Sequence, residues 1–238
     1  MSIHQTDIEL MKMQVEVLFT QDENGCLQHI NEPTGAAEPA PRFFFGYTNE
    51  GSICKFRHNL PDHVVTQLKE VAAAEPLPMN PQKIPKNRRQ FEDILQSHAP
   101  IERVWVGPAY RFPEHIAPPT NVIHLLSSKD ARLLKGDLAD IRPELNSPHP
   151  CLAIIEDSQV VSICRSVRAS ARAHEAGVET LAGYRRRGHA TSVVAAWALA
   201  VRTLNLIPLY STSWANIASQ GVARRLGLVQ YGVDYHVT

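Results

Sequence analysis

The chain has 238 residues, which is enough for one large or two small domains with a buried core. Lys plus Arg and Asp plus Glu number 24 each, and this zero formal net charge argues against a nucleic-acid-binding protein, which usually carries a basic excess. No apolar run approaches the roughly 20 residues that cross a bilayer, and the first residues do not resemble a secretion signal. We therefore expect a cytoplasmic protein with no membrane or nucleic-acid partner.

The potential metal ligands do not form a recognisable pattern. None of the four cysteines, at positions 26, 54, 151 and 164, belongs to a C-x-x-C pair, and the eleven histidines are scattered along the chain. We assign no metal site and expect the cysteines to be reduced thiols.

Proline marks the clearest boundary in the chain. Sixteen of the seventeen prolines lie at or before Pro150, and segments 75–86 and 113–119 have the composition of extended connectors. We therefore predict two domains, a small α+β domain at residues 1–116 and a more regular α/β (α+β) domain at residues 120–238.

The first domain is predicted from turn signals and hydrophobic spacing. Its expected elements are a strand at 13–19 followed by an Asn24-Gly25 turn, a hairpin from 42–47 and 52–57, a helix at 62–74 that Asp62 can cap, a helix at 88–97 and a strand at 101–106. No chemical motif occurs in this part, so an accessory or docking role is the default hypothesis.

The second domain shows alternating strands and helices. Its expected elements are a strand at 121–126, short helices at 127–141, a hairpin from 151–157 and 159–168, a strand at 174–182, an arginine-rich loop, a helix over 193–204, a strand at 207–214, a second helix and a last strand at 229–237. In the last strand, apolar residues alternate and should share one face: Val229, Tyr231, Val233, Tyr235 and Val237. Hairpins followed by strand–helix–strand units predict a mixed sheet with helices on its faces.

Segment 184–191 carries the clearest chemical signal, because it follows a strand and opens a helix. The first turn of a helix leaves N–H groups unpaired at the positive end of its dipole, where a phosphate can bind. Gly188 and the small Ala190 would let a phosphate approach the backbone, and the arginines at 185–187 supply cationic donors. Without this strand–helix context, the arginines would be read as an ordinary solvated loop.

The motif Arg185-x-x-Gly188-x-Ala190 resembles the signature of the GNAT superfamily of acetyl-CoA-dependent N-acetyltransferases, with Tyr184 directly before it. Residues 216–228, an Asn that opens a helix ending in Leu-Gly-Leu, resemble the second signature of that family. The resemblance covers about half of the chain. It implies a GNAT-like mixed, mostly antiparallel sheet flanked by helices, preceded by the small α+β domain.

The resemblance also implies a cofactor and the residues that bind it. Acetyl-CoA, or coenzyme A, would act as co-substrate, with its diphosphate on the N–H groups at the helix start and its pantetheine arm along the preceding strand. The implied binding residues are Val178, Glu179, Thr180, Arg185, Arg186, Arg187, Gly188, His189, Ala190, Thr191 and Asn216. Asn216 could equally serve only as a helix cap.

Catalysis needs a base for the attacking amine, and some family members carry a glutamate on the strand before the signature. Glu175 is our first candidate and Glu179 our second, although both could be solvated or salt-bridged strand residues. Many members also use a tyrosine to protonate the leaving thiolate, but Ala223 occupies that position here. Ser219, Tyr210 or Tyr231 could substitute, or the thiolate could leave without a protein acid.

Three functions from different classes follow from these features. The leading one is an N-acetyltransferase that moves an acetyl group to a primary amine, on a small molecule or on a protein, by direct attack. The second is a non-catalytic acyl-CoA-binding sensor or regulatory module, which the missing tyrosine favours. The third is a docking protein that acts through residues 1–116. The sequence is compatible with a homodimer and does not name the acceptor.

Overall fold

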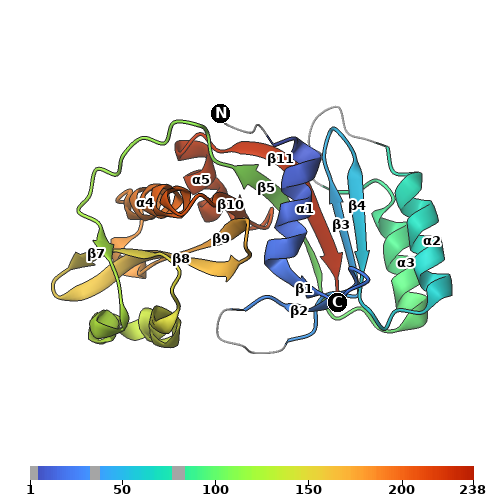
Figure 1. Ribbon diagram of the computed structural model, residues 1–238, viewed down its shortest axis with the longest axis horizontal. Helices are drawn as coiled ribbons and strands as arrows, with labels where there is room; N and C mark the ends of the chain where they lie inside the picture. The colour runs from blue at the N-terminus through green and yellow to red at the C-terminus, as the bar shows by residue number, and fades with distance from the viewer. Residues whose placement is uncertain (1–4, 33–37, 77–83) are drawn as a thin grey trace.

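A computed structural model describes residues 5–32, 38–76 and 84–238, and it centres on a nine-stranded sheet (Figure 1). The strand order in this sheet is β4-β3-β11-β5-β10-β9-β8-β7-β6, and β1 and β2 form a separate two-stranded sheet. The strands are β1 (Phe19–Gln21), β2 (Leu27–Ile30), β3 (Phe43–Tyr47), β4 (Ser52–Phe56), β5 (Val104–Arg111), β6 (His124–Leu125), β7 (Cys151–Glu156), β8 (Gln159–Ala169), β9 (Ala173–Thr180), β10 (Ile207–Ser211) and β11 (Val229–Val237). The large sheet is mixed but mostly antiparallel, with β9 and β10 running parallel, as we expected.

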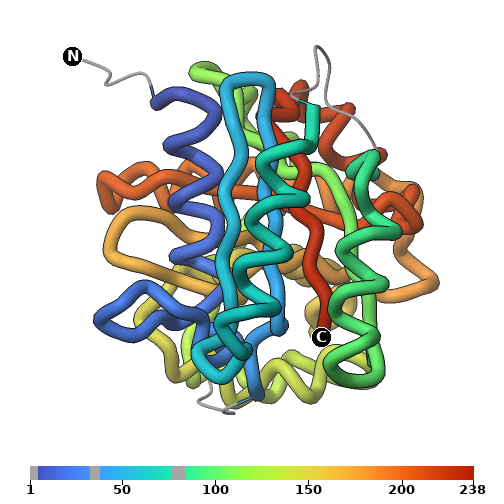
Figure 2. The backbone as a smooth tube through the Cα atoms, turned by 90° about the vertical axis from the view of Figure 1, so that its right-hand side faces the viewer, coloured from blue at the N-terminus to red at the C-terminus, as the bar shows by residue number. Residues whose placement is uncertain are grey.

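Helices cover both faces of the sheet. They are α1 (Asp7–Leu18), α2 (Asp62–Ala73), α3 (Arg88–His98), α4 (His189–Thr203) and α5 (Ile217–Arg225), with 3₁₀ helices η1 (Ser128–Leu133), η2 (Gly136–Asn146) and η3 (Ala182–Tyr184). Helix α1 packs on one face together with η1 and η2, whereas α2 to α5 pack on the other face. Figure 2 shows α1 and α3 on opposite sides of the β3–β4 hairpin. Within the described part of the chain, none of the helices combines the length and the apolar character that a membrane crossing requires.

Alternation along the strands divides the core between the two faces. In β3, Phe44 packs with α1, whereas Phe43 and Phe45 pack with α2 and α3. Around α4, Trp197 is fully buried and belongs to the hydrophobic core on that face. The site therefore rests on a sheet with hydrophobic cores on both sides.

The sheet crosses the boundary that proline composition predicts. Strand β5, from the N-terminal half, lies between β10 and β11, and β3 pairs with the other edge of β11. The predicted boundary at 116–120 falls in the segment between β5 and β6. That residues 1–116 and 120–238 are separate domains stays a prediction, although their strands share one sheet.

The strand predicted at 13–19 is wrong, because most of that segment belongs to helix α1. Thr6 and Glu9 form a capping box, in which each side chain accepts a hydrogen bond from the backbone of the other residue. Alternating Met13, Val15 and Val17 imitate a strand. The helix is instead buried nearly all round, so its apolar residues do not keep to one helical face.

Most of the other predicted elements are confirmed, with shifted ends. The hairpins, helices α2 to α5 and the strands around the arginine-rich loop are present, although β6 contains only two residues and β5 begins at Val104. Pro61, not Asp62, is the N-cap of α2. Residues 77–83 of the connector predicted at 75–86 lie outside the described residues.

The single face predicted for the last strand is also wrong. The pairing of β11 with β5 shifts register between Gln230 and Gly232, as in a β-bulge. Tyr231 therefore packs in the α1 core, whereas Val233, Tyr235 and Val237 pack with α2 and α3. One extra residue in a strand moves every side chain before it to the opposite face of the sheet.

Further along β11, Asp234 is completely buried, and both of its carboxylate oxygens lack a hydrogen-bond partner among the described residues. Burial, reinforced by the nearby Glu175 carboxylate, raises the pKa of Asp234 well above 3.8. Between the pKa values of Asp234 in the unfolded and folded states, the folded protein therefore keeps this carboxyl protonated while the unfolded chain releases the proton.

This difference predicts that the free energy of unfolding falls as the pH rises from about 4 toward the folded-state pKa of Asp234, by up to about 1.4 kcal/mol per pH unit. Asp234→Asn should reduce this slope, because asparagine stays neutral. Urea unfolding between pH 5 and pH 8 measures the slope. Asp62→Asn, at the exposed start of α2, is the control, and an equal slope in Asp234→Asn and the unchanged protein would contradict the assignment.

The position of β5 predicts that residues 120–238 do not fold when expressed alone. Deletion of residues 1–116 removes β5 and leaves facing edges of β10 and β11 without their partner. Circular dichroism and a thermal unfolding scan should show no cooperative transition. A folded fragment with an ordinary transition would restore the interpretation of residues 1–116 as an appended accessory domain.

Candidate functional site

Strands β9 and β10 pair over only three residues before they separate. The parallel register joins residues 173–175 of β9 to residues 207–209 of β10. Beyond Glu175, β9 continues to Thr180 while hydrogen-bonded to β8 alone. The second half of β9 therefore has an open edge inside the sheet.

The backbone groups on this open edge follow from strand alternation. The Leu181 N–H donates to the Val161 carbonyl of β8 at 3.0 Å. Since neighbouring residues face opposite ways, the N–H groups of Val178 and Thr180 face the open edge. In agreement, the Thr180 carbonyl points away from β8 and accepts a hydrogen bond from Arg185 Nε at 3.1 Å.

The arginine-rich loop ends in a turn that exposes the start of α4. Gly188 is the N-cap of α4 with a φ of 85°, a left-handed conformation that glycine adopts without a Cβ penalty. No heavy atom lies within 4 Å of the position where a Cβ would stand. The helical bonds begin when Ser192 N donates to the Gly188 carbonyl at 3.1 Å, so the N–H groups of residues 189–191 point out of the helix end.

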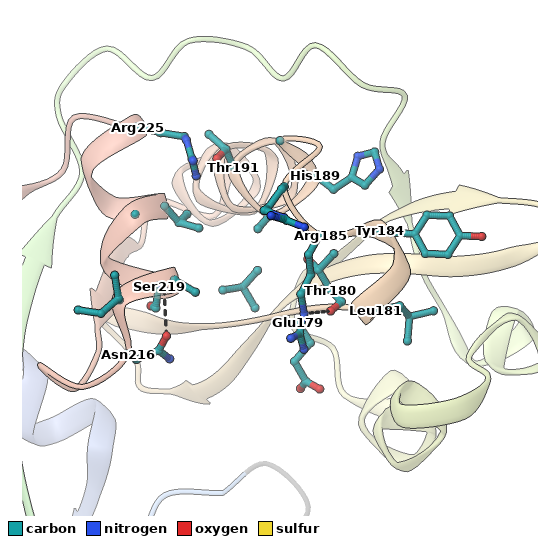
Figure 3. Close-up of a pocket in the computed structure, with 18 of the residues that line it drawn as sticks. Glu179, Thr180, Leu181, Tyr184, Arg185, His189, Thr191, Asn216, Ser219 and Arg225 are labelled. Atoms are coloured by element: carbon teal, nitrogen blue, oxygen red, sulfur yellow. Dashed lines mark hydrogen bonds between the residues drawn. The ribbon is translucent and has the colours of Figure 1, made fainter.

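A cavity of about 730 Å³ joins the open strand edge to this helix start (Figure 3). Helix α5 forms the opposite wall, and η2 contributes Asp137 and Leu138. The predicted binding residues that line the cavity are Val178, Glu179, Thr180, Arg185, Arg186, Gly188, His189, Ala190, Thr191 and Asn216. The structure thus brings nearly all of them together.

Arg187 is the predicted binding residue that does not line the cavity. Its guanidinium lies 5.0 Å from the centre of the Tyr184 ring and 3.8 Å from Glu156. One of its nitrogens also donates to the Gly183 carbonyl. These contacts hold the side chain outside the cavity, although its backbone belongs to the turn.

The α5 wall includes residues that the sequence did not single out. Asn216 caps the helix by accepting the Ser219 N–H at 3.0 Å, which fixes the direction of α5. The additional lining residues on this helix are Ile217, Ala218, Gly221, Val222, Arg224 and Arg225. Their spacing from one another was the available signal, because Ile217, Gly221 and Arg225 recur at intervals of four and therefore share a helix face.

Four of the arginines that line the cavity are not paired with an acid among the described residues. Within residues 5–32, 38–76 and 84–238, no carboxylate forms an ion pair with Arg185, Arg186, Arg224 or Arg225. Unpaired guanidinium groups beside a helix N-terminus favour an anionic ligand, phosphate above all. No group of three or more His, Cys, Asp or Glu residues suited to a metal ion occurs in the described segments.

Glu175 lies on the face of the sheet that α1 covers, so its side chain does not line the cavity. One carboxylate oxygen accepts from Ser211 N at 2.6 Å and from Ser211 Oγ at 2.8 Å, and the other accepts from Gln14 Nε2 at 3.3 Å. Burial raises the pKa of Glu175, while the Ser211 hydrogen bonds oppose this rise. The group is a buried carboxylate beside the point where β9 and β10 part.

Glu179, the second candidate base, does line the cavity and has a half-exposed side chain. Its carboxylate accepts from Arg165 Nη1 at 2.9 Å, and Arg165 also pairs with Glu144 of η2. This ion pair holds the Glu179 carboxylate against Arg165.

Of the three hydroxyl groups considered as acids, Ser219 is the one that lines the cavity. The Tyr210 hydroxyl lies 2.6 Å from Ser219 Oγ, so the two form a coupled pair. Burial raises the pKa of Tyr210 and keeps its proton in place. Tyr231 lies under α1 and donates to Gln14 Oε1 at 2.8 Å, away from the cavity.

Comparison with known proteins gives a family for part of the chain. Residues 151–237 match the family model of GNAT acetyltransferases, which confirms the resemblance of the second half. No curated protein sequence matches the chain closely enough to count as a relative.

Solved structures confirm the fold class. A GCN5-related N-acetyltransferase-like protein of Streptococcus suis matches with 16% identity over 84% of this chain and 85% of its own, at a TM-score of 0.50. A Drosophila protein matches with 13% identity over 97% and 85%, at a TM-score of 0.52. The chain covers 66% of a GNAT-family structure from Novosphingobium aromaticivorans, with 13% identity over 58% of this chain and a TM-score of 0.47.

Proposed function

We propose that this chain, whose residues 151–237 match the GNAT acetyltransferase family model, is an N-acetyltransferase that moves an acetyl group from acetyl-CoA to a primary amine. One observation carries the proposal: a single cavity connects an exposed helix start, suited to phosphate, with the open edge of β9. A ligand with phosphates at one end and a thioester at the other matches both features.

The residues around the cavity suit acetyl-CoA. The N–H groups of Gly188 to Thr191 would hold the diphosphate, with Arg185 and Arg186 beside it. The open edge at Val178 and Thr180 would pair with the amide groups of the pantetheine arm. Gly188, with empty space where a Cβ would stand, supports this placement.

Acetyl-CoA supplies the acetyl group as a thioester, which an amine attacks directly. A C–N bond forms, the C–S bond breaks, and one amine proton must leave. An N–H on the open edge of β9 would stabilise the charge that develops on the carbonyl oxygen. The protein also positions the two reactants, which provides much of the rate.

We propose Glu175 as the base, acting through Ser211. Ser211 Oγ is hydrogen-bonded to the buried carboxylate at 2.8 Å, and Ser211 itself is only partly buried. The amine proton would pass to Ser211 Oγ while the Ser211 proton passes to Glu175. Glu179 remains the alternative because it lines the cavity, although Arg165 holds its carboxylate.

The leaving thiolate would be protonated by Ser219. Ser219 lines the cavity, and its Oγ lies 2.6 Å from the Tyr210 hydroxyl. Tyr210 would keep its own proton and donate a hydrogen bond to Ser219 Oγ as the serine gives up its proton, which water would then replace. This pair would do the work of the tyrosine that Ala223 replaces. Ala223 is buried and packs in the core around α4.

For the acceptor we propose a chemical class, a primary amine on a small molecule or on a protein. The alternative function is a sensor or regulatory module that binds acyl-CoA without turnover, favoured by the buried position of Glu175. A cytoplasmic location, a homodimer and the absence of nucleic-acid and membrane partners stay predictions.

Release of free thiol from acetyl-CoA, measured with a panel of small amines and amine-bearing peptides, tests the proposal. Amine-dependent thiol release, with the acetylated product detected by mass spectrometry, supports the enzyme. Tight acetyl-CoA binding without turnover on any amine would favour the sensor. Absence of binding would remove both functions.

Gly188→Glu should abolish CoA binding, because it places a carboxylate against the diphosphate. Gly188→Ala is the matched control, since both variants carry the backbone cost of a left-handed side-chain residue, about 1–2 kcal/mol. Isothermal titration calorimetry with CoA should show lost binding only in Gly188→Glu. Unaltered affinity in that variant would show that the diphosphate binds elsewhere.

Glu175→Gln should lower kcat by about 10²-fold or more while changing CoA affinity far less. A base must be deprotonated, so the rate should fall as the pH drops through the raised pKa of Glu175, and the variant should lose this acid limb. Steady-state kinetics across pH measures both effects. Glu179→Gln is the control, and an unchanged pH profile in Glu175→Gln would transfer the role to another group.

A further inference from the structure

Gly221 lies inside helix α5 and lines the cavity. Apart from proline, glycine is the least favourable residue in a helix interior. A Cβ at this position would meet only Arg225 Nη1 at 3.8 Å and Arg224 Nη2 at 3.9 Å, which is ordinary van der Waals contact. At Gly107, by contrast, a Cβ would stand 1.8 Å from the Thr212 carbonyl oxygen. Neither backbone geometry nor packing therefore requires glycine at 221.

The two arginines whose side chains lie next to Gly221 are Arg224 and Arg225. Both are exposed, and neither pairs with an acid in the segments that the structure describes. Arginine in the last turn complements the helix dipole, but that role does not explain a glycine four residues earlier. Two guanidinium groups around an empty position instead form a seat for an anion.

The seat lies at one end of the cavity. Asn216 and Ser219 mark the reacting end of α5, and Arg225 lies nine residues after Asn216, about 13 Å along the helix. Figure 3 shows Arg225 reaching into the upper end of the cavity, whereas Arg185 enters it from the opposite wall. The seat is thus on the wall that faces the exposed start of α4.

We propose that Arg224, Arg225 and Gly221 bind the phosphate monoester on the ribose of acetyl-CoA, its 3′-phosphate. This inference rests on the proposed function and adds a second phosphate site to it. The N–H groups at the start of α4, with Arg185 and Arg186, serve the diphosphate, which leaves the α5 arginines for the remaining dianion. The bare backbone at Gly221 lets that dianion lie between both guanidinium groups.

The seat makes the 3′-phosphate a measurable determinant of affinity. The protein should bind CoA at least about tenfold more tightly than 3′-dephospho-CoA, because charge-assisted hydrogen bonds to two arginines are lost with that group. Arg225→Gln and Arg224→Gln should each weaken CoA binding about three- to tenfold and leave 3′-dephospho-CoA binding within twofold.

Isothermal titration calorimetry with both ligands, at one fixed salt concentration, tests this on the full chain. Arg89→Gln, an exposed arginine on α3, makes the same change in charge far from the cavity and should alter neither affinity. Gly221→Ala should weaken CoA but not 3′-dephospho-CoA, while the melting temperature stays equal or rises, since alanine favours helix. Selective loss with a preserved fold supports the seat.

The other outcomes overturn the inference in distinguishable ways. Equal affinity of the unchanged protein for the two ligands removes the seat but leaves CoA binding intact. Equal weakening of both ligands in Arg224→Gln and Arg225→Gln assigns these arginines to the diphosphate. If the unchanged protein binds neither ligand, the proposed function fails together with the seat.

Discussion

The brief parallel contact between β9 and β10 is the constraint on which the site depends. Only three residue pairs join the strands, and the last is Leu209 with Glu175. Immediately beyond it, the Ser211 N–H donates to the Glu175 carboxylate, so a side chain supplies an acceptor where the strands part. The open edge of β9, the exposed start of α4 and the cavity against α5 all follow from this separation.

The N-terminal half of the chain holds that separation in place. Strand β5 pairs with the far edge of β10, and α1 covers the junction with Gln14, which donates to Glu175 and accepts from Tyr231. Gln14 is fully buried, so its amide satisfies groups from two different strands at once. Residues 1–116 therefore complete the sheet that carries the site, in addition to any docking role.

The sequence predicted the parts of the site that are local and missed those that depend on distant pairing. The turn at Gly188 and the start of the helix after it lie within the eight residues 184–191, so their geometry can be inferred from spacing alone. Gln14 and Glu175 are 161 residues apart, and no periodicity links them. Helix α1 was misread because burial on nearly all sides gave it strand-like alternation, and the bulge in β11 reversed a facing that simple alternation cannot reveal.

Glu175 therefore has a structural role at the strand junction and is also the candidate base. Its carboxylate accepts three hydrogen bonds, which favour the ionised form, whereas burial disfavours that form. Burial is the larger effect, so the pKa of Glu175 lies above the ordinary carboxyl value, which is the direction that suits a base. A carboxylate held so firmly cannot swing toward a substrate, so in the proposed mechanism proton transfer passes through its one mobile donor. That donor is the Ser211 hydroxyl, because the Ser211 N–H belongs to the backbone and the Gln14 amide is buried under α1.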